Sequence, residues 1–528
     1  MEHRPIQYQP WEIAFLPSGV PADPFREAIF RVEITNPYGD VRWRDAFWDG
    51  GVWRLRWMPL EEGPHHLRVE TNLSGLPESL GVVISAAAGP DPGFRHALST
   101  SGPVRVADDG VRFARHDGTP FFLKTEETYS VASRATDAEW TAYCVARARR
   151  GFTGASLATD LVRFFASAQE QAPSAPPAFH PDLAYLTLLD RRIATLNAHG
   201  LVAIPELFRL VTIDHPQNVH SGTDLDDVVS PEDAVRLGRY LVARWGASDL
   251  LWRLALPGGR DEDDDLVALT ARIGRDLFGD DPWRSPIAVD LEERELLHPI
   301  LQTESWIGWV ASRSHGHRIE SSLRWIWTEF AEQARTEVPR PHVNIDPVVY
   351  GEQWEVNDPE SARTARALFW ASLFAAPPTG AGYTMRAIHD WRRPLPNSLS
   401  EPSSAERIPT WVEAIEDPSA AEFGRLDAML SKPRWSELSP APELLARQPF
   451  PEEPSATIGV LANSDRSIVR VYVPRRLRFE MTGLTGEYAA GWLALRDGGT
   501  DVDLPDVDGP GAFEPPDDED WILALDEI

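Results

Sequence analysis

The stretch DLAYLTLLDRRIATLNAHGLVAIPE, residues 182–206, contains one complete unit of the pattern that decides the fold. Its first part is a helical pattern that begins at Asp182 and ends before Gly200, a residue type that commonly terminates helices. Its second part, Leu201–Ile204, is a short apolar run typical of a buried strand, and the acidic residue Glu206 follows it. A helix joined to a buried strand is the repeating unit of parallel α/β folds.

The same unit recurs between residues 105 and 435. The predicted strands are Pro120–Leu123, Gly154–Leu157, Leu201–Ile204, Leu250–Leu256, Ile287–Asp290, Trp306–Val310, His342–Asp346 and Gly382–Met385. Helix-capping patterns such as Thr136–Glu139 separate them. Eight strands that alternate with helices over about 300 residues predict a (β/α)8 TIM barrel. An open doubly wound sheet is the alternative, but its usual glycine-rich phosphate loop is absent from Lys124–Thr128, the stretch after the first strand.

Both ends of the chain have a different pattern, in which apolar and polar residues alternate with period two. Near the N-terminus the alternation is clear in Ala28–Ile34 and Val52–Met58, and near the C-terminus in Ser467–Val473 and Tyr488–Leu495. Short alternating strands separated by turn residues indicate β-sandwiches. We therefore predict an α/β protein whose barrel is flanked by two small all-β sandwiches, with domains at 1–93, 105–435 and 452–528.

The charge of the chain limits its partners. There are 81 acidic and 51 basic residues, which gives a formal charge of −30. Such a surface repels nucleic acid and anionic lipid, so we expect neither as a partner. Residues 1–10 lack a signal-peptide pattern, and no stretch approaches the roughly 20 apolar residues of a membrane span. We expect a cytoplasmic protein without a membrane segment, and the sequence is compatible with a homo-oligomer.

Several kinds of active site receive no support from the sequence. The single cysteine, Cys144, falls in the middle of a predicted helix, which argues against a cysteine nucleophile. No Gly-x-Ser-x-Gly motif follows any predicted strand, which argues against a serine hydrolase of the α/β type. The acidic run Asp261–Asp265 lacks the alternating spacing of a calcium loop, and we expect neither a metal nor a cofactor.

The order of several short strings resembles the apiosidase-like glycoside hydrolases over nearly the whole chain. The strings are Asp45–Gly51, Trp53–Trp57, Asp117–Phe122, Arg149–Phe152 and Asp520–Leu525. In that family an immunoglobulin-like domain precedes the barrel, and a β-domain once labelled collagen-binding follows it. The resemblance implies a glycoside hydrolase that acts on a small carbohydrate.

The ends of the barrel strands depart from the family pattern. The family typically has Gly-Asp-Thr after strand one, Gly-Gly-Asp after strand four and Glu-Pro after strand seven. The corresponding residues here are Thr125-Glu126-Glu127, Gly258-Gly259-Arg260-Asp261 and Asp346-Pro347, the last followed by Tyr350 and Glu352. His315 resembles the histidine of a Ser-Gly-His string after strand six, and His389 with Trp391 is similar to the end of strand eight.

Hydrolysis of a glycosidic bond requires two carboxyl groups, and strand ends converge at the mouth of a barrel. The catalytic candidates are therefore Asp346, Asp261 and Glu206. The candidates for substrate binding are Glu126, Glu127, His315, Glu352, His389, Trp391 and Tyr350. Each has a structural alternative, because acids also cap loops and begin helices, and histidine and tryptophan also pack in cores.

We expect a glycoside hydrolase that removes a terminal sugar from a small oligosaccharide or plant glycoside. An acid among Asp261, Glu206 and Glu126 would act together with Asp346. The altered ends of strands one and four support an alternative, a catalytically inactive barrel that binds carbohydrate or serves as a scaffold. Arg260, beside the expected acid position of strand four, raises the further hypothesis of an anionic substrate.

Overall fold

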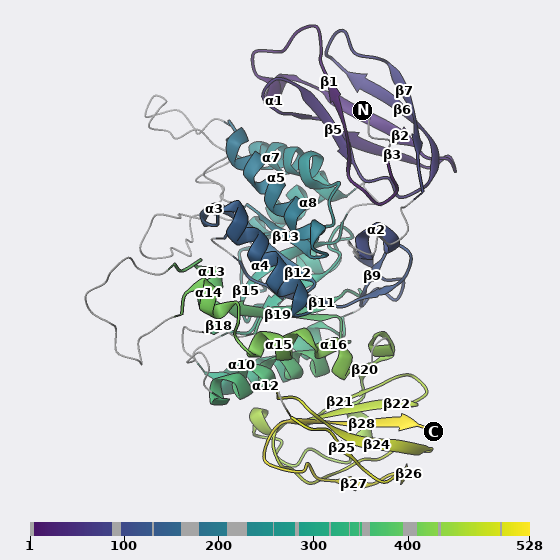
Figure 1. Cartoon of the computed structure of the whole chain (residues 1–528), viewed down its shortest axis with the longest axis vertical. Helices are drawn as coiled ribbons and strands as arrows, with labels where there is room; N and C mark the ends of the chain where they lie inside the picture. Colours follow the sequence, from purple (N-terminus) through teal and green to yellow (C-terminus); the bar gives the residue numbers. More distant parts are fainter. Residues whose placement is uncertain are drawn as a thin grey trace, which may run out of the picture.

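Three parts follow one another along the long axis of the molecule (Figure 1). In this computed structural model an N-terminal β-module lies at one end, a barrel in the middle and a C-terminal β-module at the other end. The structure describes residues 5–86, 97–128, 131–159, 179–208, 230–256, 258–279, 285–315, 318–336, 338–347, 349–350, 359–393, 409–430, 434–496 and 499–528. None of the helices within these ranges is long and apolar enough to cross a membrane.

The central part is an eight-stranded parallel barrel, which confirms the predicted α/β class. Its strands are β11 (Leu123–Glu126), β12 (Gly154–Ala158), β13 (Val202–Leu207), β14 (Trp252–Leu254), β15 (Ile287–Glu293), β16 (Val310–Arg313), β17 (His342–Asp346) and β19 (Gly380–Met385). They pair in sequence order from β11 to β17, and β11 also pairs with β19. A short strand that soon follows β17, β18 (Val349–Tyr350), pairs in parallel with β19 at the end of this nearly closed sheet.

Two of the predicted strands are wrong in position. Pro120–Phe121 form β10, an edge strand of a small antiparallel sheet with β9 (Phe113–Arg115) and β8 (Val104–Val106). Proline cannot donate a backbone hydrogen bond, which suits this edge position, and the barrel strand begins only at Leu123. The sixth strand begins at Val310, because the apolar residues before it pack in the core as a loop. Apolar loops and buried strands look alike in sequence.

Apolar side chains fill the half of the barrel in which its strands begin. Leu123, Ile204, Ala288 and Ile345 from four different strands meet there, and Phe113 of β9 packs against the same cluster. The small sheet β8–β10 therefore closes the end of the barrel at which the strands begin. Polar side chains of the strands are left to the opposite end, where active sites of such barrels lie.

Helices surround the barrel as the capping patterns predict. They are α4 (Asp137–Arg149), α5 (Leu183–Ala198), α7 (Pro231–Trp245), α8 (Asp264–Phe278), α10 (Ile319–Trp325), α11 (Ala331–Gln333) and α12 (Pro359–Ala375). The capping box at Thr136 and Glu139 is formed, with each side chain bonding the other residue's backbone nitrogen. Between α10 and α11 the helix widens into a π-helical turn, Ile326–Phe330.

The N-terminal module is a sandwich of two antiparallel sheets. One contains β1 (Trp11–Phe15), β5 (Trp53–Trp57) and β4 (Phe47–Trp48), and the other contains β3 (Val41–Asp45), β2 (Phe30–Thr35), β6 (Gly63–Thr71) and β7 (Ser79–Ile84). Polar contacts fix the module on α7: Arg244 Nη1 is 3.0 Å from Asp49, and the Tyr240 hydroxyl donates to the Trp48 carbonyl at 2.8 Å.

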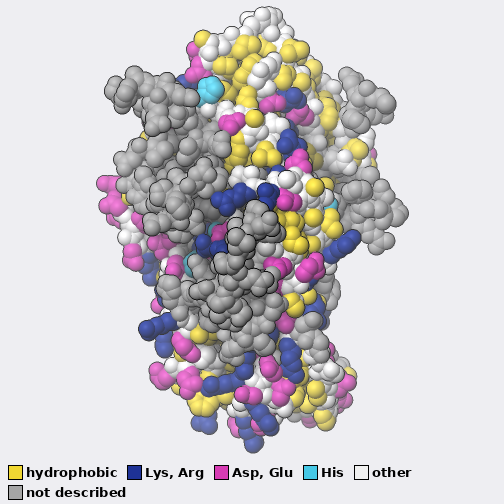
Figure 2. Space-filling view, turned by 60° about the vertical axis from the view of Figure 1, so that its left-hand side comes forward, with side chains coloured by type: hydrophobic (Ala, Val, Ile, Leu, Met, Phe, Trp, Pro, Cys, Tyr) yellow, Lys and Arg dark blue, Asp and Glu magenta, His cyan; other side chains and the backbone are white. Residues whose placement is uncertain are grey.

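The C-terminal module is built around one antiparallel sheet. Its strands are β20 (Ser439–Pro440), β21 (Gly459–Ala462), β22 (Ile468–Val473), β28 (Trp521–Glu527), β24 (Glu487–Ala494) and β25 (Val502–Asp503), in that order, with β26 (Val507–Asp508) paired to β24. Arg366 of α12 anchors the module, because its guanidinium lies 2.9 Å from Asp520. Acidic and basic side chains are interspersed over this end of the molecule (Figure 2). The domain boundaries at 93, 105, 435 and 452 stay a prediction.

The close approach of two barrel strands makes Gly382 highly sensitive to an added side chain. A Cβ atom there would lie 1.6 Å from the carbonyl oxygen of Ile345 on β17, and backbone cannot move aside cheaply. We expect Gly382→Ala to lower the thermal unfolding midpoint of the barrel by more than about 5 °C. Gly81→Ala in β7, where the new Cβ meets nothing within 4 Å, is the matched control. Equal midpoints for the two variants would contradict this account of the close approach.

Candidate active site

A group of charged side chains fills the mouth of the barrel, the end at which its strands finish. Its members are Glu127, Glu206, Arg253, Asp290, Arg313 and Asp346. Glu127 directly follows strand one of the barrel, the other acids come from strands three, five and seven, and the arginines come from strands four and six. All six are at least nine-tenths buried, and Glu206 and Arg253 are completely buried. Charges this deep persist only when they are paired with one another.

Arg253 is the centre of the group. Its Nη1 lies 2.8 Å from Glu127 Oε1 and 3.0 Å from Glu206 Oε1, and its Nη2 lies 2.9 Å from Asp290 Oδ1. Because the Glu127 and Glu206 oxygens contact the same nitrogen, they lie within about 6 Å of each other. Arg253 therefore gathers carboxylates from three different strands into one small volume.

Arg313, at the end of β16, contacts two of the same acids. Its Nη2 donates to Asp290 Oδ2 at 3.1 Å and lies 3.6 Å from Glu127 Oε2. The other terminal nitrogen of Arg313, Nη1, donates to the Leu291 carbonyl at 2.9 Å, which fixes the position of the guanidinium. Two arginines thus share Asp290 and Glu127, and the four carboxylates of the group outnumber them.

Asp346 lies beside a histidine at the end of β17. His315 Nδ1 is 3.2 Å from Asp346 Oδ2. Burial by itself would favour the neutral carboxyl, but the contact with His315 and the nearby charge of Arg313 lower the pKa of Asp346 below its ordinary value. Burial opposes the charged imidazole as well, yet Asp346 raises the pKa of His315 above its ordinary value. The aspartate is therefore held ionised.

Glu127 is shifted in the opposite direction. Burial raises the pKa of Glu127, the two arginines counteract this, and the negative charges of Glu206 and Asp346 raise the pKa further. The net result is a raised pKa. One carboxyl of the group thus favours its protonated form while another favours its ionised form. Such divergence identifies candidate acid and base partners in an active site.

Comparison with known proteins places the chain in a family. The apiosidase-like catalytic domain matches residues 107–437, which is more than half of the chain. The chain belongs to the apiosidase-like family. Residues 5–72 match a domain of unknown function, DUF5060. No curated protein matches the chain.

Solved structures with the same fold are distant in sequence from this apiosidase-like protein. A glycoside hydrolase family 5 protein from Bacteroides vulgatus is 16% identical, with a TM-score of 0.64 over 81% of this chain and 94% of that one. A second structure, described as a glycoside hydrolase, is 15% identical, with a TM-score of 0.64 over 81% of this chain and 97% of that one. A further Bacteroides vulgatus protein assigned to the glycoside hydrolases covers 99% of this chain at 13% identity, with a TM-score of 0.64. These similarities concern the fold alone.

The structure brings four of the predicted site residues together. Glu127, Glu206, Asp346 and His315 all lie at the mouth of the apiosidase-like barrel, within or beside the charged group. Their individual roles stay predictions. Among the described residues, no group of three or more His, Cys, Asp or Glu side chains could hold a metal ion.

Glu126 lies on the other side of its strand. Its carboxylate accepts hydrogen bonds from Arg147 Nε at 2.7 Å, Arg147 Nη2 at 2.9 Å and the Tyr143 hydroxyl at 2.8 Å, all from α4. Successive side chains of a strand point to opposite faces, so Glu126 faces the helices when Glu127 faces the interior. The structure therefore does not bring Glu126 to the mouth, although the sequence analysis predicts it there.

Three of the other predicted residues lie outside the charged group. Asp261 is exposed on the loop between β14 and α8, before the N-cap of that helix. His389 contacts Asp390 at 2.9 Å, and Trp391 is almost completely buried, stacked on Trp411 with ring centroids 4.5 Å apart. The Trp391 ring therefore offers no free face for a sugar. Glu352 and the side chain of Tyr350 lie outside the described residues.

Sequence reasoning missed the two arginines. Arg253 stands inside an apolar run that was predicted to be a buried strand, and Arg313 ends the strand that was placed too early. Arginine is almost never fully buried without partners. A charged residue within a predicted barrel strand was therefore the available signal, and it pointed to acids on the neighbouring strands.

The position of Glu126 predicts a structural role. Both members of its ion pair with Arg147 are almost completely buried, so removal of one charge leaves the other without compensation. We expect Glu126→Gln to destabilise the barrel by about 3–5 kcal/mol. Glu437→Gln, which breaks an exposed pair with Arg434, should leave the thermal unfolding midpoint unchanged. A stable Glu126→Gln variant that had lost only sugar binding would contradict this assignment.

Proposed function

We propose that the protein is a glycoside hydrolase that uses Glu127 and Asp346 as its carboxylate pair. The substrate class is the one that the sequence predicts, a small oligosaccharide or plant glycoside that loses a terminal sugar. The observation that carries the proposal is the opposite shift of two neighbouring carboxyl groups. The pKa of Glu127 is raised and that of Asp346 is lowered, within one ion-paired group. Membership of the apiosidase-like family supports it.

The proposed reaction follows from these protonation states. Glu127 donates its proton to the glycosidic oxygen as the bond from that oxygen to the anomeric carbon breaks. Asp346 stabilises the positive charge that develops on the sugar. It then either bonds to the anomeric carbon or removes a proton from the water that attacks it. If Asp346 bonds to the anomeric carbon, a water molecule later displaces it, and Glu127 accepts a proton from that water.

The neighbouring residues position and tune this pair. His315 holds Asp346 by a contact of 3.2 Å, and Arg253 holds Glu127 at 2.8 Å. Glu206 contacts the same guanidinium nitrogen at 3.0 Å, and its negative charge favours the protonated form of Glu127. Glu206, a predicted catalytic residue, is thereby assigned a positioning role in which it keeps Glu127 able to donate.

Removal of either proposed catalytic carboxyl should abolish turnover. We expect Glu127→Gln and Asp346→Asn each to lower kcat/KM by at least about 100-fold. The assay is a panel of nitrophenyl glycosides and natural disaccharides. Asp261→Asn, which changes an exposed acid, is the matched control and should retain full activity. Full activity of Glu127→Gln on a natural disaccharide would show that another group is the acid.

The pH dependence of kcat/KM should be bell-shaped. Activity requires ionised Asp346, so it rises with pH through the lowered pKa of that residue. It also requires protonated Glu127, so it falls as pH rises through the raised pKa. Glu206→Gln removes a negative charge that raises the pKa of Glu127, and its alkaline limb should therefore move to lower pH. An alkaline limb that stayed in place, or moved to higher pH, would exclude Glu127 as the titrating acid.

One observation favours a second candidate function, a barrel that binds carbohydrate without cleaving it. Strand four contributes Arg253 to the interior instead of an acid, and three carboxylates are engaged by that one guanidinium. In this case the panel would show no turnover by the wild type. Calorimetry would then detect a sugar that binds to the wild type but not to the Asp346→Asn variant.

A further inference from the structure

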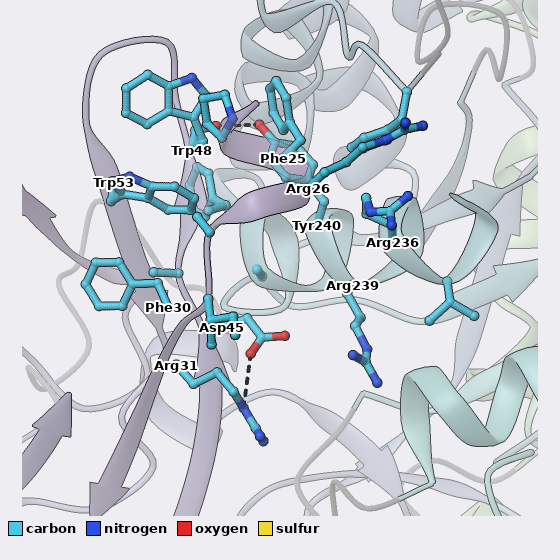
Figure 3. Close-up of a pocket in the computed structure, with 18 of the residues that line it drawn as sticks. Phe25, Arg26, Phe30, Arg31, Asp45, Trp48, Trp53, Arg236, Arg239 and Tyr240 are labelled. Carbon is cyan, nitrogen blue, oxygen red and sulfur yellow. Dashed lines mark hydrogen bonds and ion pairs between the residues drawn. The ribbon is translucent and has the colours of Figure 1, made fainter. Parts of the chain in front are cut away.

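A cavity outside the barrel lies where the N-terminal module meets α7 (Figure 3). It encloses about 320 Å³, at the lower end of the range for small-molecule sites, and junctions between domains are common places for them. Its walls come from α1 (Pro24–Glu27), from β2 to β5 and from α7. The charged group of the barrel contributes no residue to its lining.

One wall of this cavity is aromatic. The rings of Trp48 and Trp53 lie with their centroids 5.6 Å apart, and those of Phe25 and Tyr240 are also 5.6 Å apart. Trp48 is only half-buried, so part of its indole faces the cavity. The Tyr240 hydroxyl is occupied by the Trp48 carbonyl, which fixes both residues. Aromatic faces of this kind pack against the apolar faces of sugar rings.

The lining is also basic. Four arginines line the cavity, Arg26, Arg31, Arg236 and Arg239, against two acids, Asp45 and Glu232. Figure 3 shows Trp48, Trp53 and Phe30 on one side and Arg26, Arg236 and Arg239 on the other. This excess of positive charge is local, because the chain as a whole carries a formal charge of −30.

The arginines differ in how fully they are paired. Arg26 and Arg236 both contact Asp233, and Arg31 lies 3.5 Å from Asp45. Within the described part of the chain, Arg239 has no carboxylate within 4 Å, although its charge acts on Asp45, and it donates one hydrogen bond, to the Asp276 carbonyl at 3.3 Å. Arg239 is exposed, and it extends from α7 beside the cavity. Its guanidinium retains donors for an anionic group.

We infer that this cavity binds a sugar that carries a carboxylate, such as a uronic acid. The ring would lie against Trp48, and the carboxylate would accept hydrogen bonds from Arg239 and the neighbouring arginines. A neutral sugar would leave the arginines unused, and an acid without a ring would leave the aromatic wall uncovered. The site is distinct from the proposed catalytic centre and does not depend on the barrel being active.

The site is formed before any ligand binds. The junction between the module and α7 is held by Arg244 against Asp49 at 3.0 Å, by Arg56 against the Arg244 carbonyl at 2.7 Å and by the Tyr240 bond to Trp48. A fixed lining avoids the cost of ordering loops when a ligand binds. The N-terminal module supplies the two tryptophans and two of the four arginines, and α7 supplies the tyrosine and the other two arginines, so the cavity requires both parts.

Titration calorimetry of the full chain with glucuronic acid and with glucose tests this inference. We expect glucuronic acid to bind at least ten times more tightly than glucose. Arg239→Ala should weaken glucuronic acid binding at least tenfold, and Trp48→Ala should weaken both sugars. Arg434→Ala, an exposed arginine on the C-terminal side of the barrel, is the matched control and should change nothing. Thermal unfolding checks that the variants are folded.

Asp346→Asn separates this site from the barrel mouth. The inference predicts that this variant binds glucuronic acid as the wild type does. The inference would be overturned if glucose and glucuronic acid bound with equal affinity, or if glucuronic acid did not bind measurably. It would also be overturned if Asp346→Asn abolished the binding of glucuronic acid while Arg239→Ala retained it. None of these outcomes depends on whether the barrel hydrolyses glycosides.

Discussion

The guanidinium of Arg253 is completely buried in the barrel, and the arrangement around it follows from the need to compensate its charge. Strands one, three and five each supply a carboxylate to it. The same contacts that neutralise the arginine hold Glu127 next to Glu206 and within the electrostatic influence of Asp346. The side chains that compensate the charge of Arg253 are therefore also the ones that position the proposed catalytic carboxyl Glu127. Apolar side chains pack in the half of the barrel where the strands begin, and the charged group lies at the mouth.

Hydrophobic pattern and capping signals were sufficient to predict the fold. His342–Asp346 forms the predicted strand at the predicted residues, and the capping box predicted at Thr136–Glu139 begins a helix, because both have clear boundaries in sequence. Strands one and six were misplaced where proline or apolar loop residues imitate a strand. The site was predictable only in part. Asp346 and Glu206 follow from their places at strand ends, whereas the choice between Glu126 and Glu127 depends on which face of β11 each occupies. Arg253 required knowledge of partners on three other strands.

The flanking modules are held by buried or half-buried ion pairs. Arg244 joins the N-terminal module to α7, and Arg366 joins the C-terminal module to α12. Long helices of the barrel thus serve as platforms for both modules, as Figure 1 shows. One of these junctions encloses the arginine- and aromatic-lined cavity, so a contact that anchors a module also shapes a second place for a ligand. The two sites lie in separate parts of the molecule and differ in net charge.

The most direct test is a crystal structure of the protein with an iminosugar, chosen from a panel by its effect on thermal stability. The ring nitrogen of such an inhibitor is cationic, and it imitates the positive charge of the glycosidic transition state. The account predicts that this nitrogen lies within hydrogen-bond distance of Asp346, with Glu127 on the side of the departing group. An iminosugar bound at the mouth that touches neither carboxyl, or one that binds only outside the barrel, would contradict it.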